Sequence, residues 1–421
     1  MNRDRIDVVH AVTASLSLVL LKGQLSYLQK VGFHPAALCS TGSEVAAART
    51  EESTPIITVS MEREISPFRD LISLIRLWWL LRELRPAICN AGTPKAGLLV
   101  GLAAWLNRIP CRVYTLRGLR LETATGLKRS VLVFTERIAC ACAHRVISVS
   151  PSLRQRAIEL GLVPARKAIV LASGSSNGVN SSRFGPTPER LEKAKQIRRK
   201  LGIGAGQPVV GFTGRFTRDK GVPELLTAFQ IVREKVPDAV LLLVGSYEPG
   251  DPVPPEARAA IESDPHVVTV EFTPNVDLYY LVMDVFVLPT HREGFPNTVL
   301  EAQAAERPVV TTRATGAIDS IVDGTTGLLV PVGDSVALAE ALKRLLANSS
   351  LAIQLGRAGR CRVLREFTQD RVWSALADEY VCLAKRARLS MPAERFGPVC
   401  SGQMHSELEN TLKETNGNVE R

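Results

Sequence analysis

The feature that most restricts the fold of this chain is a repeated alternation of short apolar segments with helix-forming segments. The apolar segments are five to seven residues long, the usual length of a β-strand. Between them lie predicted helices, among them residues 67–84 and 94–107. The predicted strands are residues 6–12, 35–40, 55–60, 86–90, 111–116, 145–150 and 168–172 in a first series, and 208–214, 239–245, 267–272, 285–290, 307–312 and 327–332 in a second.

The two series are separated by "SGSSNGVNSSRFGPTPE", whose Gly, Ser, Asn and Pro content is typical of a linker. A chain of 421 residues also exceeds what one hydrophobic core usually supports. We therefore predict an α/β protein of two facing Rossmann-like domains with parallel sheets and a cleft between them. The predicted divisions are a first domain at 1–178, a linker at 179–188, a second domain at 189–370, a helix at 371–389 that crosses back to the first domain, and a disordered tail at 390–421.

Two loops of the second series carry charges that suit a nucleotide sugar. In "GFTGRFTRDKG" a strand ends near Gly214, and Arg215 and Lys220 follow before the next helix. In "HREGFPNTVLEA" the carboxylates of Glu293 and Glu301 stand on either side of a Gly-Phe-Pro-Asn turn. Both loops follow parallel strands, so we expect them at the same sheet edge. Cations and helix-start amides bind a diphosphate, and carboxylates bind vicinal sugar hydroxyls.

Glu301 has a second interpretation that the loop alone does not exclude. Pro296 suits the first turn of a helix, and Thr298 and Glu301 have the spacing of a capping box. In that case Glu301 would serve only as a helix cap.

With these motifs, the second half resembles the donor domain of the retaining glycosyltransferases of family 4, which have the GT-B fold. Glu293 and Glu301 match that family's E-x7-E motif, "GRFTRDKG" matches its Arg/Lys diphosphate loop, and the likeness continues through "ATGAIDSIVDGTTGLLVPVGD". The resemblance implies that Glu301 binds the ribose and Glu293 a hydroxyl of the donor sugar. It makes Glu293, Arg215 and Lys220 the expected catalytic residues, because the two cations would stabilise the departing diphosphate. The resemblance also implies that the sugar and diphosphate pocket is lined by the backbone amides near Gly294, Phe295, Pro296 and Asn297.

The first half resembles a narrower bacterial group that builds capsule, exopolysaccharide or lipopolysaccharide units on a polyprenyl diphosphate carrier. The likeness lies in "KGQLSYLQKVGF", "EREISPFRDLISLIRL", "TPKAGLL", "GLRLETATGLKR" and "VISVSPSLRQRAIELGL". It implies transfer of a sugar, with retention of configuration, from a nucleotide sugar, with UDP as the expected nucleotide, to a lipid-linked or saccharide acceptor. Two alternatives remain open: a UDP-sugar 2-epimerase of the same fold, and a protein that binds a nucleotide sugar without catalysis.

The chain departs from the family at one position. Many members place a histidine of the first domain beside the donor sugar, whereas the matching positions here are Arg117 and the segment Asn90-Ala91-Gly92. A retaining transfer need not use a separate base, because the departing diphosphate oxygen can accept the proton. Arg117 could stabilise that leaving group or be purely structural. We interpret His10 as a core histidine rather than a site residue, and we assign no role to His291.

The candidates for the acceptor side are two lysines near predicted helix starts and the arginine already named. Lys22 precedes Gly23 at the start of the first helix, and Lys95 follows Pro94 at the start of another. Helix starts attract anions. Each lysine could equally be a solvated surface residue. The acceptor-side candidates are therefore Lys22, Gly23, Lys95 and Arg117.

The formal net charge of +10 calls for an anionic partner or a generally basic surface. No nucleic-acid motif is present, so nucleic acid is not an expected partner. The predicted helix 67–84 mixes arginines with Trp78, Trp79 and leucines, which suits peripheral attachment to the cytoplasmic face of the inner membrane. The eight scattered cysteines lack zinc-site spacing and fit reduced thiols in the cytoplasm. No Asp-x-Asp pair occurs, so no metal and no cofactor are expected.

Overall fold

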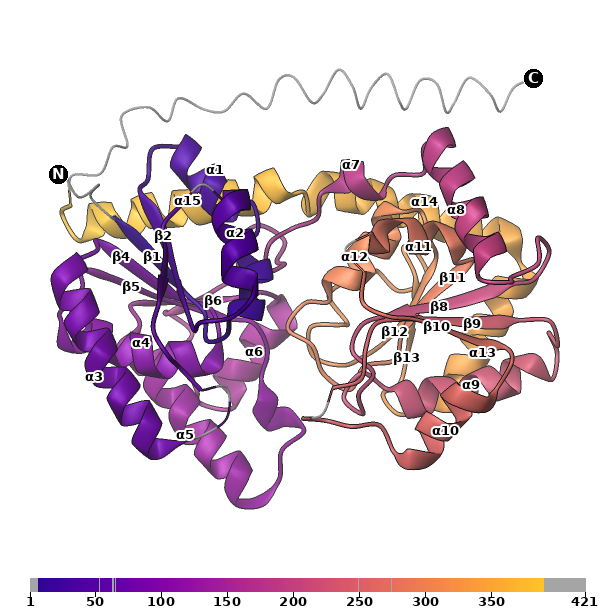
Figure 1. Cartoon of the computed structure of the whole chain (residues 1–421), viewed down its shortest axis with the longest axis horizontal. Coiled ribbons are helices and arrows are strands. Elements are labelled where there is room, and N and C mark those ends of the chain that lie inside the picture. The colour runs from indigo at the N-terminus through magenta and orange to yellow at the C-terminus, as the bar shows by residue number, and fades with distance from the viewer. Residues whose placement is uncertain are drawn as a thin grey trace.

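A computed structural model describes residues 7–389 except positions 53, 63, 65, 249 and 274. The chain forms two α/β domains that face each other, joined by two crossings of the chain (Figure 1). The predicted tail at 390–421 lies outside the described residues.

The first domain contains a seven-stranded parallel sheet in the order β3-β2-β1-β4-β5-β6-β7. Each strand coincides with one of the seven segments predicted from the first series, with β4 ending one residue beyond its segment, which confirms those segments. Its strands are β1 Val8–Ala11, β2 Pro35–Cys39, β3 Ile56–Thr58, β4 Ile88–Ala91, β5 Cys111–Leu116, β6 Arg145–Ser148 and β7 Ala168–Ile169.

The second domain contains a six-stranded parallel sheet in the order β10-β9-β8-β11-β12-β13. All six predicted segments of the second series form strands here, so the predicted fold class is confirmed. The strands are β8 Val209–Thr213, β9 Val240–Val244, β10 Val267–Val270, β11 Val285–Leu288, β12 Val309–Thr312 and β13 Leu328–Val330.

Helices cover both faces of each sheet, as buried parallel strands require. The helical elements of the first domain are η1 Ser15–Leu21, α1 Gln24–Lys30, α2 Glu44–Glu52, α3 Pro67–Leu84, α4 Pro94–Leu106, η2 Arg120–Glu122, α5 Gly126–Cys142 and α6 Pro151–Glu159. Those that follow are α7 Ser181–Phe184, α8 Pro188–Lys200, α9 Val222–Arg233, α10 Pro255–Ser263, α11 Val276–Val282, α12 Asn297–Ala304, α13 Ser335–Ala347, α14 Ser349–Glu366 and α15 Gln369–Arg386.

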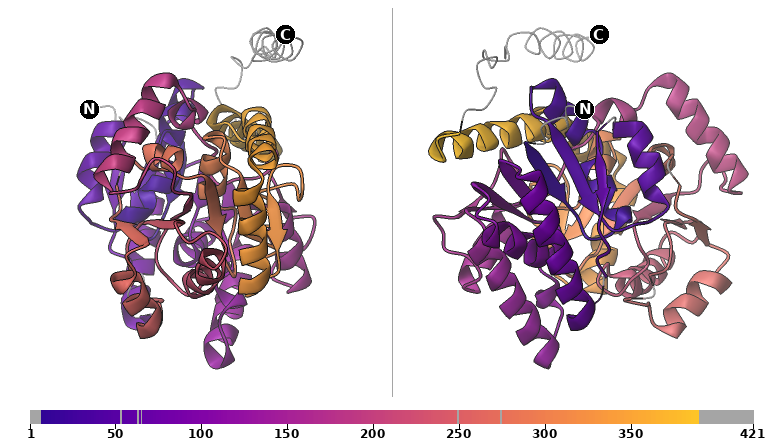
Figure 2. Two further views of the ribbon diagram at one scale, coloured as in Figure 1. Left: turned by 90° about the vertical axis from the view of Figure 1, so that its right-hand side faces the viewer. Right: turned by 60° about the vertical axis from the view of Figure 1, so that its left-hand side comes forward.

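The last helix, α15, returns from the second domain and packs along the first (Figure 2). The chain crosses between the domains near Val179 and again near Phe367. The two crossings lie side by side, because the amide of Val179 donates to the carbonyl of Phe367 at 2.9 Å. Tyr380 of α15 is fully buried against Val8 and Ile88 of the first sheet. The first domain is therefore completed by a helix that comes last in the chain.

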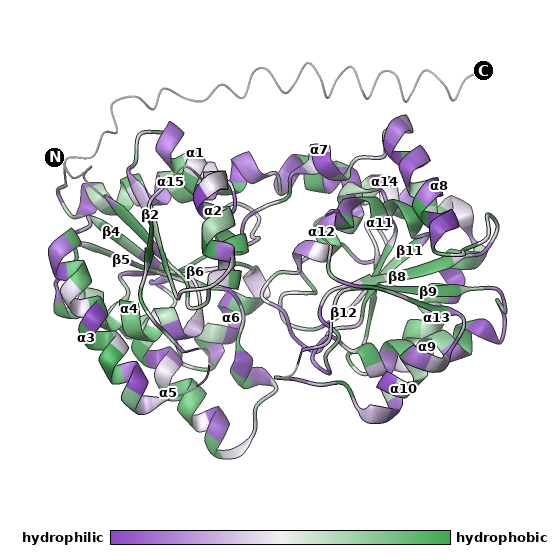
Figure 3. Cartoon of the chain, in the orientation of Figure 1, coloured by the Kyte–Doolittle hydropathy of each residue, from purple (hydrophilic) through white to green (hydrophobic). Residues whose placement is uncertain are grey.

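The helices α3, α4 and α5 lie side by side on the other face of the first sheet. Leu77 and Leu81 of α3 are buried, but much of the outer side of this layer is apolar (Figure 3). The large exposed apolar side chains here are Phe68, Leu71, Ile72, Ile75 and Trp79 on α3, Trp105 and Leu106 on α4, and Leu127 and Phe134 on α5. In the described part of the chain, no helix has the length and apolar content needed to cross a bilayer.

Candidate active site

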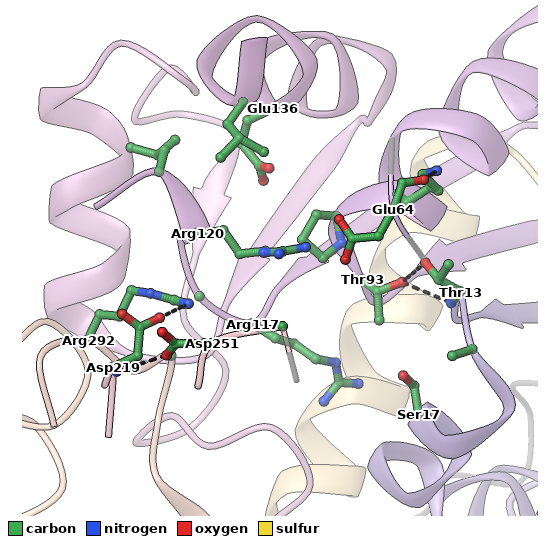
Figure 4. A pocket seen from close by; sticks show the side chains of 18 of the residues that line it. Thr13, Ser17, Glu64, Thr93, Arg117, Arg120, Glu136, Asp219, Asp251 and Arg292 are labelled. Carbon is green, nitrogen blue, oxygen red and sulfur yellow. Dashed lines mark hydrogen bonds and ion pairs between the residues drawn. The ribbon is translucent and has the colours of Figure 1, made fainter. Parts of the chain in front are cut away.

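A cavity of about 450 Å³ lies between the two domains, at the carboxyl ends of β1, β4 and β5 on one side and β8 and β11 on the other (Figure 4). This is where the parallel sheets predict a ligand. The first domain contributes residues from η1, α4, α5 and the loop after β5. The second contributes the loops after β8, β9 and β11. Among the predicted site residues, those that line the cavity are Lys95, Arg117, Arg215, Lys220, Glu293 and Gly294.

The two predicted phosphate-binding cations both reach this cavity, and each is paired with a carboxylate. Nη1 of Arg215 lies 2.9 Å from Oε2 of Glu248, in the loop after β9. Nζ of Lys220 forms an ion pair with Oε1 of Glu293. A bound anion would therefore compete with Glu248 and Glu293 for these two cations. The spacing of the motifs does not reveal these ion pairs.

The turn after β11 touches the first domain through glycine. A Cβ atom on Gly294 would lie 2.1 Å from the carbonyl oxygen of Arg117 and 3.0 Å from the amide nitrogen of Gly118. No side chain fits between the two backbones there. The contact holds the loop that carries Glu293 against the loop that carries Arg117, so both domains build one site.

Gly214 shapes the start of the phosphate loop. Its φ of +147° lies in the region that favours glycine, and its amide donates to the carbonyl of Val244 at 2.9 Å. This hydrogen bond ends β8 beside β9 and directs the following residue, Arg215, toward the cavity. Gly214 itself does not line the cavity.

Among the described residues, Arg117 has no carboxylate partner. Its guanidinium points into the cavity (Figure 4), and its one recorded hydrogen bond runs from Nη1 to the carbonyl of Ser176 at 3.3 Å. Nε is buried without a partner, and no carboxylate of the described residues pairs with the side chain. Burial lowers the pKa of Arg117 to about 10.

The segment that lacks the family histidine makes room for this arginine. A Cβ atom on Gly92 would lie 3.2 Å from Nε of Arg117, so the glycine leaves the guanidinium its place. Asn90 is turned inward, where Nδ2 donates to the hydroxyl of Tyr380 at 2.7 Å. The same hydroxyl is 2.9 Å from Nε2 of His10, whose burial lowers its pKa to about 3. The interpretation of His10 as a core histidine is confirmed.

Glu301 is separate from the cavity and is not a helix cap. The structure records no side-chain hydrogen bond at the start of α12, and Pro296 is the residue before the helix, so the capping-box interpretation was wrong. Its Oε2 instead accepts a hydrogen bond from the hydroxyl of Tyr280 at 2.7 Å. Burial raises the pKa of Glu301 to about 7. Glu293 and Glu301 therefore occupy different environments, and the ribose-binding role of Glu301 stays a prediction.

The other residues of the Gly-Phe-Pro-Asn turn contact the region where the chain crosses between domains. The ring of Phe295 is buried, with its centroid 5.2 Å from that of Phe367, so it cannot line the cavity. Pro296 is buried as well. Oδ1 of Asn297 accepts from the hydroxyl of Ser175 at 3.3 Å. These three side chains therefore lie outside the cavity, and the role of the amides near them in binding sugar and diphosphate stays a prediction.

Lys22 and Gly23 also lie outside the cavity, at the junction with α15. A Cβ atom on Gly23 would lie 2.6 Å from the indole of Trp373, and the carbonyl of Lys22 accepts from Nδ2 of Asn177 at 2.9 Å. They do not line this cavity, and their role on the acceptor side stays a prediction. Close packing against the last helix, which no local pattern indicates, explains the glycine.

Lys95 lines the cavity but is not a solvated lysine. Its Nζ lies 2.8 Å from Oδ1 of Asp70 on α3, and the lysine side chain is only 11% exposed. Lys95 also donates to the carbonyl of Glu64. The pair ties the start of α4 to the start of α3. His291, which has no assigned role, contacts Glu224 at 2.9 Å outside the cavity.

Several residues at the site were not predicted from the sequence. Arg292 pairs with Asp219, and its Nε donates to the hydroxyl of Thr123 across the domain boundary at 2.9 Å. The hydroxyl of Thr315 likewise donates to Glu122 at 2.8 Å. Arg292 stands beside Glu293 in the quoted motif, so its neighbourhood could have suggested it. The cavity residues missed by the sequence reasoning also include Arg120, Glu136, Glu248 and Asp251.

Within the described ranges, no three His, Cys, Asp or Glu side chains gather in a way that could hold a metal ion. The expectation that neither a metal nor a cofactor is needed stays a prediction.

Two family models match this chain. Residues 21–174 match the one described as glycosyl transferase 4-like domain, and residues 207–348 match the one described as glycosyl transferases group 1. The chain is 38% identical over 380 residues, 90% of its length and 98% of the relative, to the capsular polysaccharide biosynthesis glycosyltransferase CapM of Staphylococcus aureus. It is 26% identical over 324 residues, 76% of its length and 81% of the relative, to the UDP-Gal:alpha-D-GlcNAc-diphosphoundecaprenol alpha-1,3-galactosyltransferase of Escherichia coli.

Solved structures agree with the fold. Anabaena Alr3699/HepE in complex with UDP and glucose matches with a TM-score of 0.74 at 16% identity, over 89% of this chain and 99% of that one. WaaG, a glycosyltransferase involved in lipopolysaccharide biosynthesis, matches with a TM-score of 0.69 at 16% identity, over 89% and 99%. The GT-B fold predicted from the sequence is confirmed.

Proposed function

Because the chain belongs to the family of glycosyltransferases with a 4-like first domain and a group 1 second domain, we propose that it transfers a sugar from a UDP-sugar to a saccharide on a polyprenyl diphosphate carrier. The transfer retains the configuration of the sugar and serves the assembly of a bacterial surface polysaccharide. The observation that carries the proposal is the guanidinium of Arg117, which has no carboxylate partner among the described residues and lines the same cavity as Arg215 and Lys220.

The charges of the cavity support a diphosphate-bearing donor. Arg117, Arg215 and Lys220 are three of the six cations that line it, and Arg117 has no carboxylate partner in the described part of the chain. A buried cation costs free energy unless an anion compensates it. The galactosyltransferase of E. coli named above uses UDP-Gal, which makes UDP the first nucleotide to test.

The proposed chemistry depends on charge and position. The bond between the sugar and the diphosphate breaks, while an acceptor hydroxyl attacks on the same face and the departing diphosphate oxygen takes its proton. Arg215, Lys220 and Arg117 stabilise the negative charge that develops on that oxygen. Removing one such donor commonly lowers the rate about a hundred- to a thousandfold. Glu293, held by Lys220, accepts a hydrogen bond from a hydroxyl of the donor sugar.

A lipid-linked acceptor requires access to a membrane surface, and the layer of α3, α4 and α5 suits this. The side chains of Phe68 and Trp79 on α3 are 86% and 60% exposed. Arginines of the same helix, Arg69, Arg76 and Arg82, are exposed beside them. An apolar helix side flanked by cations binds the interface of an anionic bilayer. These side chains support our proposal that the protein binds the cytoplasmic face of the inner membrane.

Product analysis tests the proposed activity. The purified protein is incubated with labelled UDP-sugars and a membrane extract, with and without EDTA. Sugar that passes into the organic phase, in an amount that EDTA does not reduce, is the expected result. Free epimerised sugar would identify a 2-epimerase, and a bound but unchanged nucleotide sugar would identify a binding protein. The anomeric coupling in the isolated product reports whether configuration is retained.

A further inference from the structure

Helix α5 of the first domain places a buried carboxyl group at the wall of the cavity, whereas the phosphate-binding loops belong to the second domain. Glu136 is 7% exposed, and its carboxyl group points toward the interior of the cavity (Figure 4). Its Oε1 accepts a hydrogen bond from the hydroxyl of Tyr114 at 2.6 Å. Neither the family motifs nor the proposed donor chemistry uses this residue.

The surroundings of Glu136 leave half of its hydrogen-bonding capacity unused. Among the described residues no cation forms an ion pair with it, and Oε2 has no recorded hydrogen bond. Burial raises the pKa of Glu136 to about 7. A buried carboxyl group without a cation destabilises a fold, so its place at a cavity wall favours an external partner.

The position of the carboxyl group is fixed by close packing. A Cβ atom on Gly97 of α4 would lie 2.5 Å from the ring of Tyr114, so only glycine leaves room for this ring between sheet and helix. Tyr114 is itself 2% exposed and directs its hydroxyl to Glu136. The packed ring of Tyr114 thus fixes the position of the carboxyl group of Glu136.

The cavity wall around Glu136 has both polar and apolar groups. Leu98 of α4, Leu121 of η2 and Leu132 of α5 line the cavity together with Glu136. Arg120 projects into the same space (Figure 4). A saccharide ring has an apolar face of C–H groups and a rim of hydroxyls, so a leucine surface beside a carboxyl group matches it.

We propose that Glu136 binds a hydroxyl group of the acceptor saccharide through Oε2 and, with Leu98, Leu121 and Leu132, forms the subsite that selects the acceptor. The assignment rests on the proposed glycosyl transfer. The assignment adds to that function the residue of the first domain that recognises the sugar already attached to the carrier.

The test compares Glu136→Gln with Tyr114→Phe and with Glu340→Gln, which removes an exposed carboxylate of α13 far from the cavity. At pH 8, above the pKa of about 7, Glu136 is a charged hydrogen-bond acceptor, so its loss in Glu136→Gln should raise the KM for the lipid-linked acceptor about ten- to a hundredfold. The KM for the UDP-sugar and the Kd for UDP should stay within about twofold of the wild-type values. Tyr114→Phe keeps the carboxyl group and should raise the acceptor KM by a smaller factor. Glu340→Gln should match the wild type.

Three results would overturn the assignment. An unchanged acceptor KM in Glu136→Gln would show that no acceptor hydroxyl uses the carboxyl group. Equal losses of UDP binding, donor KM and thermal stability would show that Glu136 only holds the fold. Wild-type protein that binds UDP but transfers no sugar would refute the proposed function and this subsite with it, whereas normal transfer by Glu136→Gln would refute the subsite alone.

Discussion

Replacing Arg117 by methionine should change stability and ligand affinity in opposite directions. The guanidinium faces the cavity with Nε unpaired, and burial lowers its pKa to about 10. Because the folded-state pKa is lowered, the unfavourable contribution of this cation is fully present below about pH 10, hence at pH 7. A pKa change from 12.5 to about 10 corresponds to at most about 3.4 kcal/mol. Water in the cavity reduces that figure, so we expect Arg117→Met to stabilise the unliganded protein by about 1–2 kcal/mol.

The expected effect on UDP is a loss. If the guanidinium binds the diphosphate, each charge-assisted hydrogen bond contributes about 1.5–3 kcal/mol, or roughly ten- to a hundredfold in Kd. Differential scanning calorimetry without ligand should show a Tm higher by several degrees, since 1 kcal/mol corresponds to about 2–4 °C in a domain of this size. Titration calorimetry should show UDP binding weakened by the stated factor.

A matched control is Arg313→Met, which removes an exposed arginine that pairs with Asp323 outside the cavity. It should leave UDP affinity unchanged and the Tm within about a degree of the wild type. A lower Tm for Arg117→Met together with normal UDP affinity would refute the reasoning. Arg117 would then be a structural residue at the end of a strand.

Three further predictions concern the two loops and the membrane. Arg215→Ala and Lys220→Ala should each weaken UDP binding roughly ten- to a hundredfold without unfolding the protein; normal affinity in both variants would remove these residues from the site. Burial raises the pKa of Glu301 to about 7, so the stability it contributes is present below about pH 4.5 and lost as the pH rises to about 7. Thermal melts at several pH values should show that Glu301→Gln removes this pH-dependent loss of stability, and titration calorimetry should show weaker UDP binding. If the pH dependence of the Tm changes but UDP affinity does not, Glu301 has no ribose-binding role. The protein should co-sediment with anionic vesicles and be only partly released by salt. Trp79→Ala should make release complete, whereas Trp78→Ala, at a side chain packed on the core, should instead cost several kcal/mol of stability. Complete release of the wild type by salt would reject insertion of Trp79.

The order of strands and helices follows from the sequence because it depends on local patterns. A strand buried on both faces must be an apolar run, and the helix between two parallel strands must show an apolar stripe. All thirteen predicted strands are therefore present. The same reasoning brought Lys220 and Glu293 to one cavity, since the carboxyl ends of parallel strands share an edge.

The tertiary structure decided which partner each charged or special residue has. The carboxyl group of Glu301 accepts a hydrogen bond from the hydroxyl of Tyr280 and does not cap a helix. The space beside Gly23 is filled by Trp373 of α15. The sequence presents Glu136 as one more polar residue inside a helix, and only the packing of Tyr114 against Gly97 places its carboxyl group at the cavity. These contacts join residues that lie far apart along the chain. Local patterns report the period of an element and the edge at which it ends, whereas a contact between elements depends on how they pack.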